Sequence, residues 1–350
     1  MRKILPKIFI EGKEIDYLEG SYNYPGNFSA TSLTFNIPLT QGGMQKLWNK
    51  EVTLFLHPSD SYPLFRGWIK RINETFNSME IFAQDAIGYM VQAGGQSKAK
   101  VRLTNKDNLD GYTAGAFITK IIERANLDGK IKTTYVGDTS PRINSVSEPF
   151  RGVVDVKGAI ESMVSKAIDN SGTLPRPNLL RIIDDGTNSQ LIIELESDVD
   201  SAPIVHVFTE EANITDLNII NKKIPTVITV QGKDGISSTF THTSGMEAFD
   251  RNYLDVTHDK LKSPAECHDF AAKLWRTNER LQFEYGLEVT EGAYLNENDV
   301  VSIITNEPEF SGNYRVIGKT ISFSPSAFSL GLTINRKPPT LAEYISSRDN

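Results

Sequence analysis

Residues 64–72 read LFRGWIKRI, and residues 79–90 read MEIFAQDAIGYM. Aromatic and branched side chains typical of strands fill the first segment and the start of the second, and the turn signal Phe76-Asn77-Ser78 separates them. Gly67 indicates a bulge or a close backbone approach in a bent strand. Asp85 follows the second strand and is expected to cap the turn or short helix after it. The stretch therefore predicts two neighbouring antiparallel strands.

The N-terminal part of the chain continues this strand pattern. Further short strands are predicted over residues 7–10, 32–37 and 52–56, and residues 32–37 alternate polar and apolar side chains as a half-buried strand does. Five or six short strands joined by close turns are typical of a small barrel or sandwich. We therefore expect a first β-barrel domain over residues 1–104.

The middle of the chain changes to a mixed pattern of helices and strands. Residues 113–126 and 155–169 carry apolar side chains at helical spacing, with Asp155 at the N-cap position of the second helix. Residues 179–195 read as a hairpin. We therefore expect an α+β domain over residues 105–203.

Strand patterns return after this segment and are interrupted by one helix. The run Ser263-Pro264-Ala265-Glu266 is a capping box with proline at the first helical position, and it predicts a helix over residues 263–281 with Cys267 on its apolar stripe. We expect a second β-barrel domain over residues 204–337 and a C-terminal tail over residues 338–350. The expected fold class is mainly β with an α+β insert, that is, two small β-barrel domains of similar topology separated by a mixed α+β domain.

Length and composition narrow the function classes. The 350 residues are 39% hydrophobic and 23% charged, which fits several globular domains and excludes a disordered chain. The net charge of −7 makes the chain a poor binder of nucleic-acid phosphates. Its single cysteine excludes an intrachain disulfide and a cysteine-based zinc site. Without an apolar run of about 18 residues or a signal peptide, we expect no membrane insertion by this chain and synthesis in the host cytoplasm.

The sequence contains no recognisable catalytic or metal-binding motif. Its five histidines lack H-E-x-x-H spacing, and neither a G-x-S-x-G elbow nor a Walker A loop occurs. Asp184 and Asp185 fall in the expected hairpin turn and are read as turn residues. We therefore expect no catalytic residue, no metal and no cofactor, and a protein that is not an enzyme.

Residues 281–314 contain many acidic side chains but no Lys or Arg. The acidic residues of this window are Glu284, Glu288, Glu291, Glu297, Asp299, Glu307 and Glu309. A solvated face of a sheet would explain the bias, and so would a surface that repels a polyanion or meets a basic partner. We take Glu288, Glu291, Glu297 and Asp299 as the candidate acidic patch. Changing Glu288, Glu291 and Glu297 to lysine should leave folding nearly intact, because exposed charges contribute little to stability.

Two parts of the sequence together resemble a known family. The first is the pattern F-x-G-x-I at residues 65–69 followed by A-x-D-x-x-x-Y at residues 83–89. The second is Asp299-Val300-Val301 followed by G-x-Y-x-V at residues 312–316, although the family pattern has Pro-Gly before the aspartate, where this chain has Glu297-Asn298. In this order, the motifs resemble the phage tail baseplate hub protein family. That family includes the central hub of contractile-tailed phages, prophage tail hub proteins, and the N-terminal modules of tail-associated lysins and of the type VI spike.

The resemblance implies a structural tail or baseplate hub protein of a tailed bacteriophage. Two barrels per chain in a homotrimer would give a pseudo-sixfold ring that joins the hexameric tail tube to the trimeric central spike or fibre. The implied partners are two further copies of the chain, a tail tube or distal tail ring protein, a central spike or fibre protein, and the tape measure protein. Phage DNA would pass through the ring without specific binding, and the protein would be located in the virion, at the tail tip or baseplate. The acidic patch would then face the channel or a ring interface.

Two other functions stay open from the sequence. One is a hexameric distal-tail or tube-initiator ring protein. The other is a barrel-based glycan hydrolase, which requires two carboxylates brought together on adjacent strands. The sequence by itself offers no such pair.

Overall fold

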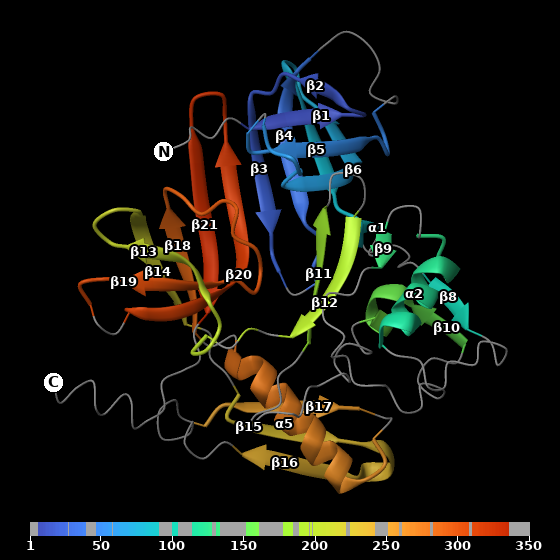
Figure 1. Ribbon diagram of the computed structural model, residues 1–350. Coiled ribbons are helices and arrows are strands. Elements are labelled where there is room, and N and C mark those ends of the chain that lie inside the picture. Colours follow the sequence, from blue (N-terminus) through green and yellow to red (C-terminus); the bar gives the residue numbers. More distant parts are fainter. Residues whose placement is uncertain are drawn as a thin grey trace. The chain divides into compact units, whose positions relative to one another are not determined.

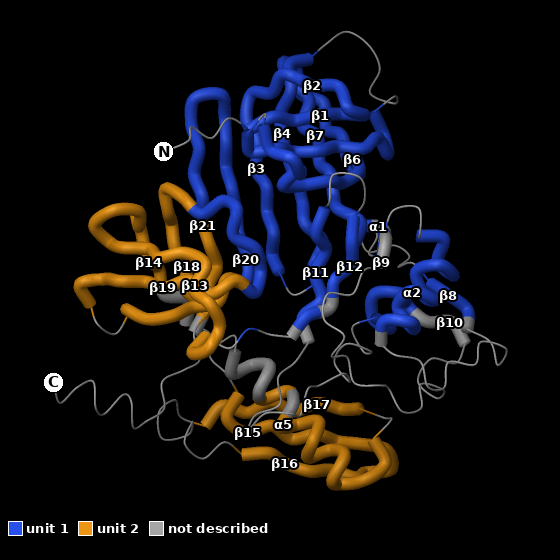
Figure 2. Tube along the Cα trace, in the orientation of Figure 1, with its two compact units in different colours: residues 1–197, 292–298, 317–330 blue, residues 198–291, 299–316, 331–350 orange. Residues whose placement is uncertain are grey.

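The computed structural model is mainly β, as the sequence predicts (Figure 1). It describes residues 6–26, 28–39, 47–57, 59–90, 100–103, 114–127, 131–133, 152–160, 178–184, 189–195, 197, 199–221, 225–241, 251–258, 261–280, 283–307 and 310–335. The predicted tail over residues 338–350 lies outside them. The chain divides into two compact units (Figure 2). The first unit comprises residues 1–197, 292–298 and 317–330, and the second comprises residues 198–291, 299–316 and 331–350.

An antiparallel sheet forms the N-terminal part of the first unit. Its strands are β1 (Lys7–Ile10), β2 (Lys13–Ile15), β3 (Glu19–Tyr24), β4 (Ser32–Pro38), β5 (Glu51–Phe55), β6 (Phe65–Glu74) and β7 (Ser78–Gln84). They pair in the order β3-β4-β7-β6-β5-β1-β2, and the second half of β20 (Gly312–Phe323) pairs with β3. In β4, Leu33, Phe35 and Ile37 are buried while the residues between them are half-buried, which confirms the predicted alternation.

The sheet of the first unit does not close into a barrel along the described strands. At one end, β2 pairs with β1 and with no other described strand. At the other end, β3 is continued by β20, a strand that the sequence assigns to the second barrel. The described strands therefore form an open path, and the predicted domain boundaries stay a prediction.

In β6, the close backbone approach lies at Gly67 as the sequence predicts, while the bulge lies a few residues further on. The pairing of β6 with β7 shifts register between Ile69 and Arg71, which marks a bulge. A Cβ atom at Gly67 would lie 2.4 Å from the carbonyl oxygen of Gln84. Glycine is required at this position because the backbone of β7 passes too close for any side chain.

The α+β part of the first unit packs on one apolar core. Its elements are α1 (Ile87–Met90), β8 (Lys100–Leu103), α2 (Ala114–Arg124), β9 (Ile131–Thr133), β10 (Gly152–Asp155), β11 (Asn178–Asp184) and β12 (Ser189–Leu195). Helix α2 confirms the first predicted helix, and β11 and β12 confirm the hairpin. Asp155 accepts a hydrogen bond from the Gly158 backbone (3.2 Å), as an N-cap does, and residues 161–169 of that predicted helix lie outside the described residues.

The core of this part joins the hairpin, α2 and the N-terminal sheet of the same unit. Phe117, Ile118 and Ile121 of α2 are fully buried in it. They form one cluster with Trp68 of β6 and Leu180 of β11, among other apolar side chains. Apolar burial thus fixes the hairpin against the end of the first sheet.

The second unit contains the remaining strands and one long helix. Its elements are β13 (Ile204–Thr209), β14 (Ile214–Asn221), β15 (Val227–Gln231), the 3-10 turn η2 (Lys233–Gly235), β16 (Ser237–Thr241), β17 (Tyr253–Thr257), α5 (Pro264–Arg280), β18 (Phe283–Val289), β19 (Val300–Ile304), the first part of β20, and the end of β21 (Phe328–Asn335). Strand β14 pairs with β18, whose other neighbour is β21, and β13 runs parallel to β19, which pairs with β20. A separate sheet has the order β16-β15-β17.

Helix α5 confirms the predicted capping box. The backbone N–H of Glu266 donates to Ser263 Oγ (3.2 Å), and the Glu266 carboxylate accepts from the Lys262 backbone (2.6 Å). Cys267 is fully buried and Trp275 nearly so, in a cluster with side chains of β15. The predicted apolar stripe is therefore the face that covers this small sheet. Among the described helices, none combines the length and apolar character needed to cross a membrane.

The turn before Asp299 departs from the family pattern in its residues. Asn298 stands where the pattern has glycine, and its φ is +77°. Asparagine tolerates this left-handed conformation better than other side chains that have a Cβ. The amide of Asn298 also accepts a hydrogen bond from the Ser197 backbone (2.6 Å) and donates to Glu194 (3.0 Å).

Candidate functional site

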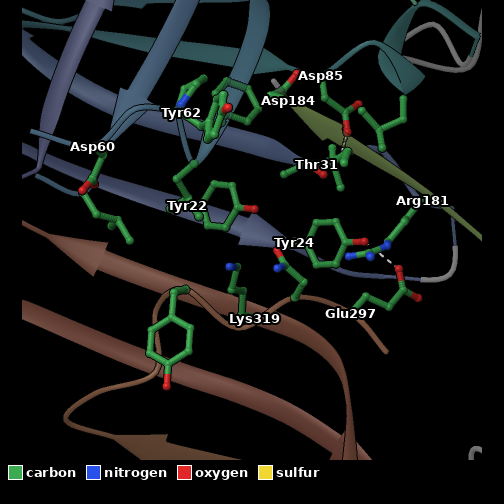
Figure 3. A pocket seen from close by; sticks show the side chains of 18 of the residues that line it. Tyr22, Tyr24, Thr31, Asp60, Tyr62, Asp85, Arg181, Asp184, Glu297 and Lys319 are labelled. Atoms are coloured by element: carbon green, nitrogen blue, oxygen red, sulfur yellow. Dashed lines mark hydrogen bonds between the residues drawn. The ribbon is translucent and has the colours of Figure 1, made fainter. Parts of the chain in front are cut away.

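A cavity of about 700 Å³ lies within the first unit (Figure 3). Its walls come from β3, from the segment before β6, from the end of β11, and from the 292–298 segment with Lys319. Among its lining residues are Tyr22, Tyr24, Thr31, Asp60, Tyr62, Asp85, Arg181, Asp184, Tyr294, Glu297 and Lys319. Tyrosine rings and charged groups thus surround one space.

Asp85 lines the cavity and also performs the predicted capping role. Its carboxylate accepts hydrogen bonds from the backbone N–H groups of Thr31 (3.0 Å) and Ile87 (3.0 Å). Burial of the carboxyl raises the pKa of Asp85 to about 6, and these hydrogen bonds lower it only in part. Through these hydrogen bonds, Asp85 links the residue before β4 to the start of α1. It also places a carboxyl with a raised pKa at the cavity wall.

Asp184 brings a second perturbed carboxyl to the same cavity. It ends β11 and accepts a hydrogen bond from Ser189 Oγ (2.7 Å). Burial raises the pKa of Asp184 to about 7, and the charge of Asp85 adds to the rise, while Ser189 and Arg66 lower it. Asp184 keeps some exposed area because it borders the cavity. Asp185 lies outside the described residues.

The sequence reading of Asp184 as a turn residue missed this role. Asp85 directly follows β7 and Asp184 ends β11, but the two are about a hundred positions apart in the chain. Only the docking of the hairpin onto the N-terminal sheet brings them to one cavity. No local pattern indicates that contact.

Glu297 does not behave as an exposed patch residue. It is 3% exposed, and its Oε2 accepts a hydrogen bond from Tyr24 Oη (2.5 Å). Burial and the neighbouring Glu297 carboxylate hold the pKa of Tyr24 well above its usual value. The expectation that Glu297 can become lysine with little loss of stability is therefore wrong, because a buried cation would replace a carboxylate that is buried and hydrogen-bonded.

The other three patch residues lie in the second unit and differ from one another. Glu288 is exposed on β18 and stands opposite Asp216 of β14, so two like charges face each other. Glu291 is half-buried and accepts a hydrogen bond from Asn213 Nδ2 (2.6 Å), with His206 Nε2 at 3.3 Å. Asp299 is half-buried. Of the four candidates, Glu288 best fits a solvent-facing acidic surface.

Other acidic residues of the window also divide between surface and interior. Glu284 is 7% exposed, which excludes it from a solvated face. Glu307 is exposed, and Glu309 lies outside the described residues. Within the part of the chain that the structure describes, no group of three or more His, Cys, Asp or Glu side chains could hold a metal ion.

Comparison with known proteins shows which solved structures share this fold. No protein-family model matches the sequence, and no curated protein matches it. A tail protein from Neisseria meningitidis MC58 aligns over 96% of this chain and 97% of its own, with 13% identity and a TM-score of 0.66. The 43 kDa tail protein of prophage MuSo2 from Shewanella oneidensis aligns over 96% and 97%, with 9% identity and a TM-score of 0.71.

A secretion protein shares the fold as well. The E. coli c3393 protein, a component of the type VI secretion system with structural similarity to T4 bacteriophage tail proteins gp27 and gp5, aligns over 95% of this chain and 79% of its own, with 11% identity and a TM-score of 0.54. The chain therefore has the fold of phage tail proteins and type VI spike-like proteins. The resemblance predicted from the sequence is confirmed at the level of the fold.

Proposed function

We propose that this chain is a structural tail hub protein of a tailed bacteriophage, located at the tail tip or baseplate of the virion. The observation that carries the proposal is the fold, which matches phage tail proteins over 96% of the chain. The order of the sequence motifs supports the same function independently. In this proposal the homotrimer forms a pseudo-sixfold ring between the hexameric tail tube, or a distal tail ring, and the trimeric spike or fibre.

The proposed ring uses two similar strand-rich domains per chain, with boundaries at residues 1–104, 105–203 and 204–337. Three chains then present six such domains to a sixfold partner. Each chain contacts two others through different surfaces, because a threefold ring requires heterologous contacts. The tape measure protein is a further proposed partner.

The acidic surface fits a ring through which DNA passes without binding. With a net charge of −7 per chain, the field of three copies adds up to repel a polyanion. Glu288 is the side chain that we propose for the channel or ring interface, with Glu291 and Asp299 beside it in sequence. Glu297 supports the fold of the first unit instead, because its carboxylate is buried against Tyr24.

The glycan hydrolase alternative deserves a test because Asp85 and Asp184 share a cavity. The hydrogen bonds that Asp85 accepts from backbone N–H groups argue against a catalytic role of Asp85. A carboxylate that caps a helix is poorly placed for proton transfer. We propose a non-enzymatic protein. Purified chain should release no reducing sugar from peptidoglycan, and release that Asp184→Asn abolishes would favour the hydrolase.

The mass of the assembled protein tests the hub proposal. Three copies of the 39.0 kDa chain give about 117 kDa, and six copies give about 234 kDa. We expect light scattering to find the trimer, alone or after addition of the tail tube protein, and cryo-electron microscopy to place three copies at the tail tip. A hexamer in the tail would support the distal-tail or tube-initiator ring instead.

A further inference from the structure

Four exposed aliphatic side chains gather on two paired strands of the second unit, β13 and β19 (Figure 2). On β13, Ile204, Val205 and Val207 are 48%, 47% and 45% exposed, and Ile304 at the end of β19 is 53% exposed. Among the described residues, no other valine or isoleucine is exposed. These four residues are called the β13 patch below. Single apolar residues on a surface are ordinary, but a group of them on neighbouring strands indicates an interaction site.

The pairing of the two strands shows which face carries the patch. Strand β13 runs parallel to β19, with Thr209 opposite Ile304. Residues two apart on a strand point to the same face, so Val207 and Ile304 are neighbours on one face of the sheet. Phe208 and Ile303, which point to the other face, are buried. The patch therefore lies on the outside of the second unit.

Strand β13 is also an open edge among the described strands. It pairs with β19 and with no other described strand. Natural edge strands are usually protected from other chains by lysine, proline or a bulge. A register shift after Ile204 bends the start of β13, but the strand reads Ile-Val-His-Val-Phe-Thr and has no lysine or proline. Such an edge is suited to pairing with another chain.

Acidic side chains border the patch. Glu210 and Glu211 follow β13 directly and are exposed. The backbone N–H of Asn306 donates to the Glu210 carboxylate (2.8 Å), which holds Glu210 beside the end of β19. Neither residues 204–221 nor residues 283–307 contain a lysine or arginine. An apolar centre with a charged rim is typical of protein interfaces, and this rim favours a basic protein surface and repels nucleic acid.

The N-terminal sheet of the same chain has the complementary charge. Residues 1–100 carry 11 Lys and Arg against 9 Asp and Glu, a net charge of +2, whereas residues 201–350 carry 14 against 20, a net charge of −6. Strand β2 is an open end of the N-terminal sheet among the described strands, and its Lys13 is exposed. The chain thus carries two unlike open edges of opposite charge, and a head-to-tail contact between copies requires two unlike surfaces.

We propose that the β13 patch is the contact between copies of this chain, and that it packs on the β2 edge of the next copy. Lys13 of that copy then meets Glu211, because Asn306 already holds Glu210. Burial of the four aliphatic side chains stabilises the contact, and the charges set its register. The inference rests on the proposed hub function and deepens it, since a trimeric ring needs one such contact per copy.

The first test compares the assembly of the wild type with that of the Val207→Asp/Ile304→Asp double variant. Phe76→Asp is the matched control, because Phe76 is 95% exposed at the turn between β6 and β7. Light scattering over a dilution series, with and without the tail tube protein, gives the concentration at which each protein dissociates. The double variant should dissociate at a concentration at least about tenfold higher than the wild type, and the control should match the wild type. Circular dichroism checks that both variants fold.

Charge reversal then tests the occupant of the patch. Lys13→Glu and Glu211→Lys should each weaken assembly by about two- to fivefold, and both changes in one chain should restore it. Losses that simply add in the doubly changed chain would overturn the assignment of the β2 edge.

The outcomes separate this inference from the hub proposal. A folded Val207→Asp/Ile304→Asp variant that forms the wild-type trimer overturns the inference and leaves the hub proposal intact. If that trimer no longer binds the tail tube or spike protein, the occupant of the patch is the other protein. A hexamer that the double variant dissociates supports the patch as a contact between copies but contradicts the trimeric hub. A wild type that stays monomeric with the tail tube protein present overturns both.

Discussion

Replacing Asp184 by asparagine should change how the stability of the chain depends on pH. The pKa of Asp184 rises from 3.8 to about 7 in the folded chain because the carboxyl is buried beside Asp85. Between these two values the folded form holds a proton that the unfolded form has lost. The contribution of this proton to the free energy of unfolding is fully present below pH 3.8 and is lost as the pH rises through 7. Asparagine carries no such proton, and its Oδ1 can still accept the hydrogen bond from Ser189.

The magnitude follows from the shift. Between pH 5 and the folded-state pKa of about 7, only the folded wild type holds the Asp184 proton, so its free energy of unfolding falls over these two pH units. At about 1.36 kcal/mol per unit, the loss is about 2.7 kcal/mol. Solvent in the cavity screens part of this interaction, so we expect the free energy of unfolding to change by about 1 to 2.5 kcal/mol. Asp85, with its pKa raised to about 6, adds a loss of the same sign in both proteins, and only the part that depends on the charge of Asp184 differs between them.

The assay is urea denaturation of wild type and Asp184→Asn at pH 5, 6, 7 and 8.5, followed by tryptophan fluorescence and circular dichroism. The free energy of unfolding of the variant should fall less with rising pH than that of the wild type, so that the two curves converge or cross. Asp216→Asn is the control, because Asp216 is exposed and its variant should run parallel to the wild type. Parallel curves for Asp184→Asn over this range would refute the reasoning.

Three further outcomes follow from the packing of single residues. Gly67→Ala should lower the free energy of unfolding by about 1–3 kcal/mol in denaturation, because its Cβ would lie 2.4 Å from the carbonyl oxygen of Gln84; a wild-type melting temperature would contradict this. Glu288→Lys should leave stability unchanged or raise it by about 0.2–1 kcal/mol, since it turns a like-charge pair with Asp216 into an opposite one, and a marked loss would show that Glu288 is not a surface residue. Cys267 is fully buried, so its thiol should react with a thiol reagent only at the rate at which the second unit opens, and fast labelling of the folded chain would exclude the described packing of α5.

Local patterns predicted those features of the chain that depend on neighbouring residues. The alternation in residues 32–37 predicted β4, and the capping box at Ser263 predicted the start of α5, because side-chain periodicity and helix caps act over a few residues. The spacing around Asp299 predicted a tight turn, and Asn298 adopts there the left-handed conformation that glycine favours. The order of such motifs was also sufficient to indicate the tail protein fold.

What the sequence alone determined was therefore the strand-rich class, the bounds of many elements and the family resemblance. The tertiary structure decided which charged groups meet. Asp85 and Asp184 reach one cavity only because the β11–β12 hairpin packs on the core of the N-terminal sheet. Glu297 leaves the solvent only because its segment folds into the first unit beside Tyr24. Burial and long-range contacts set the pKa values and the chemistry of a carboxylate, and neither is encoded in the residues next to it.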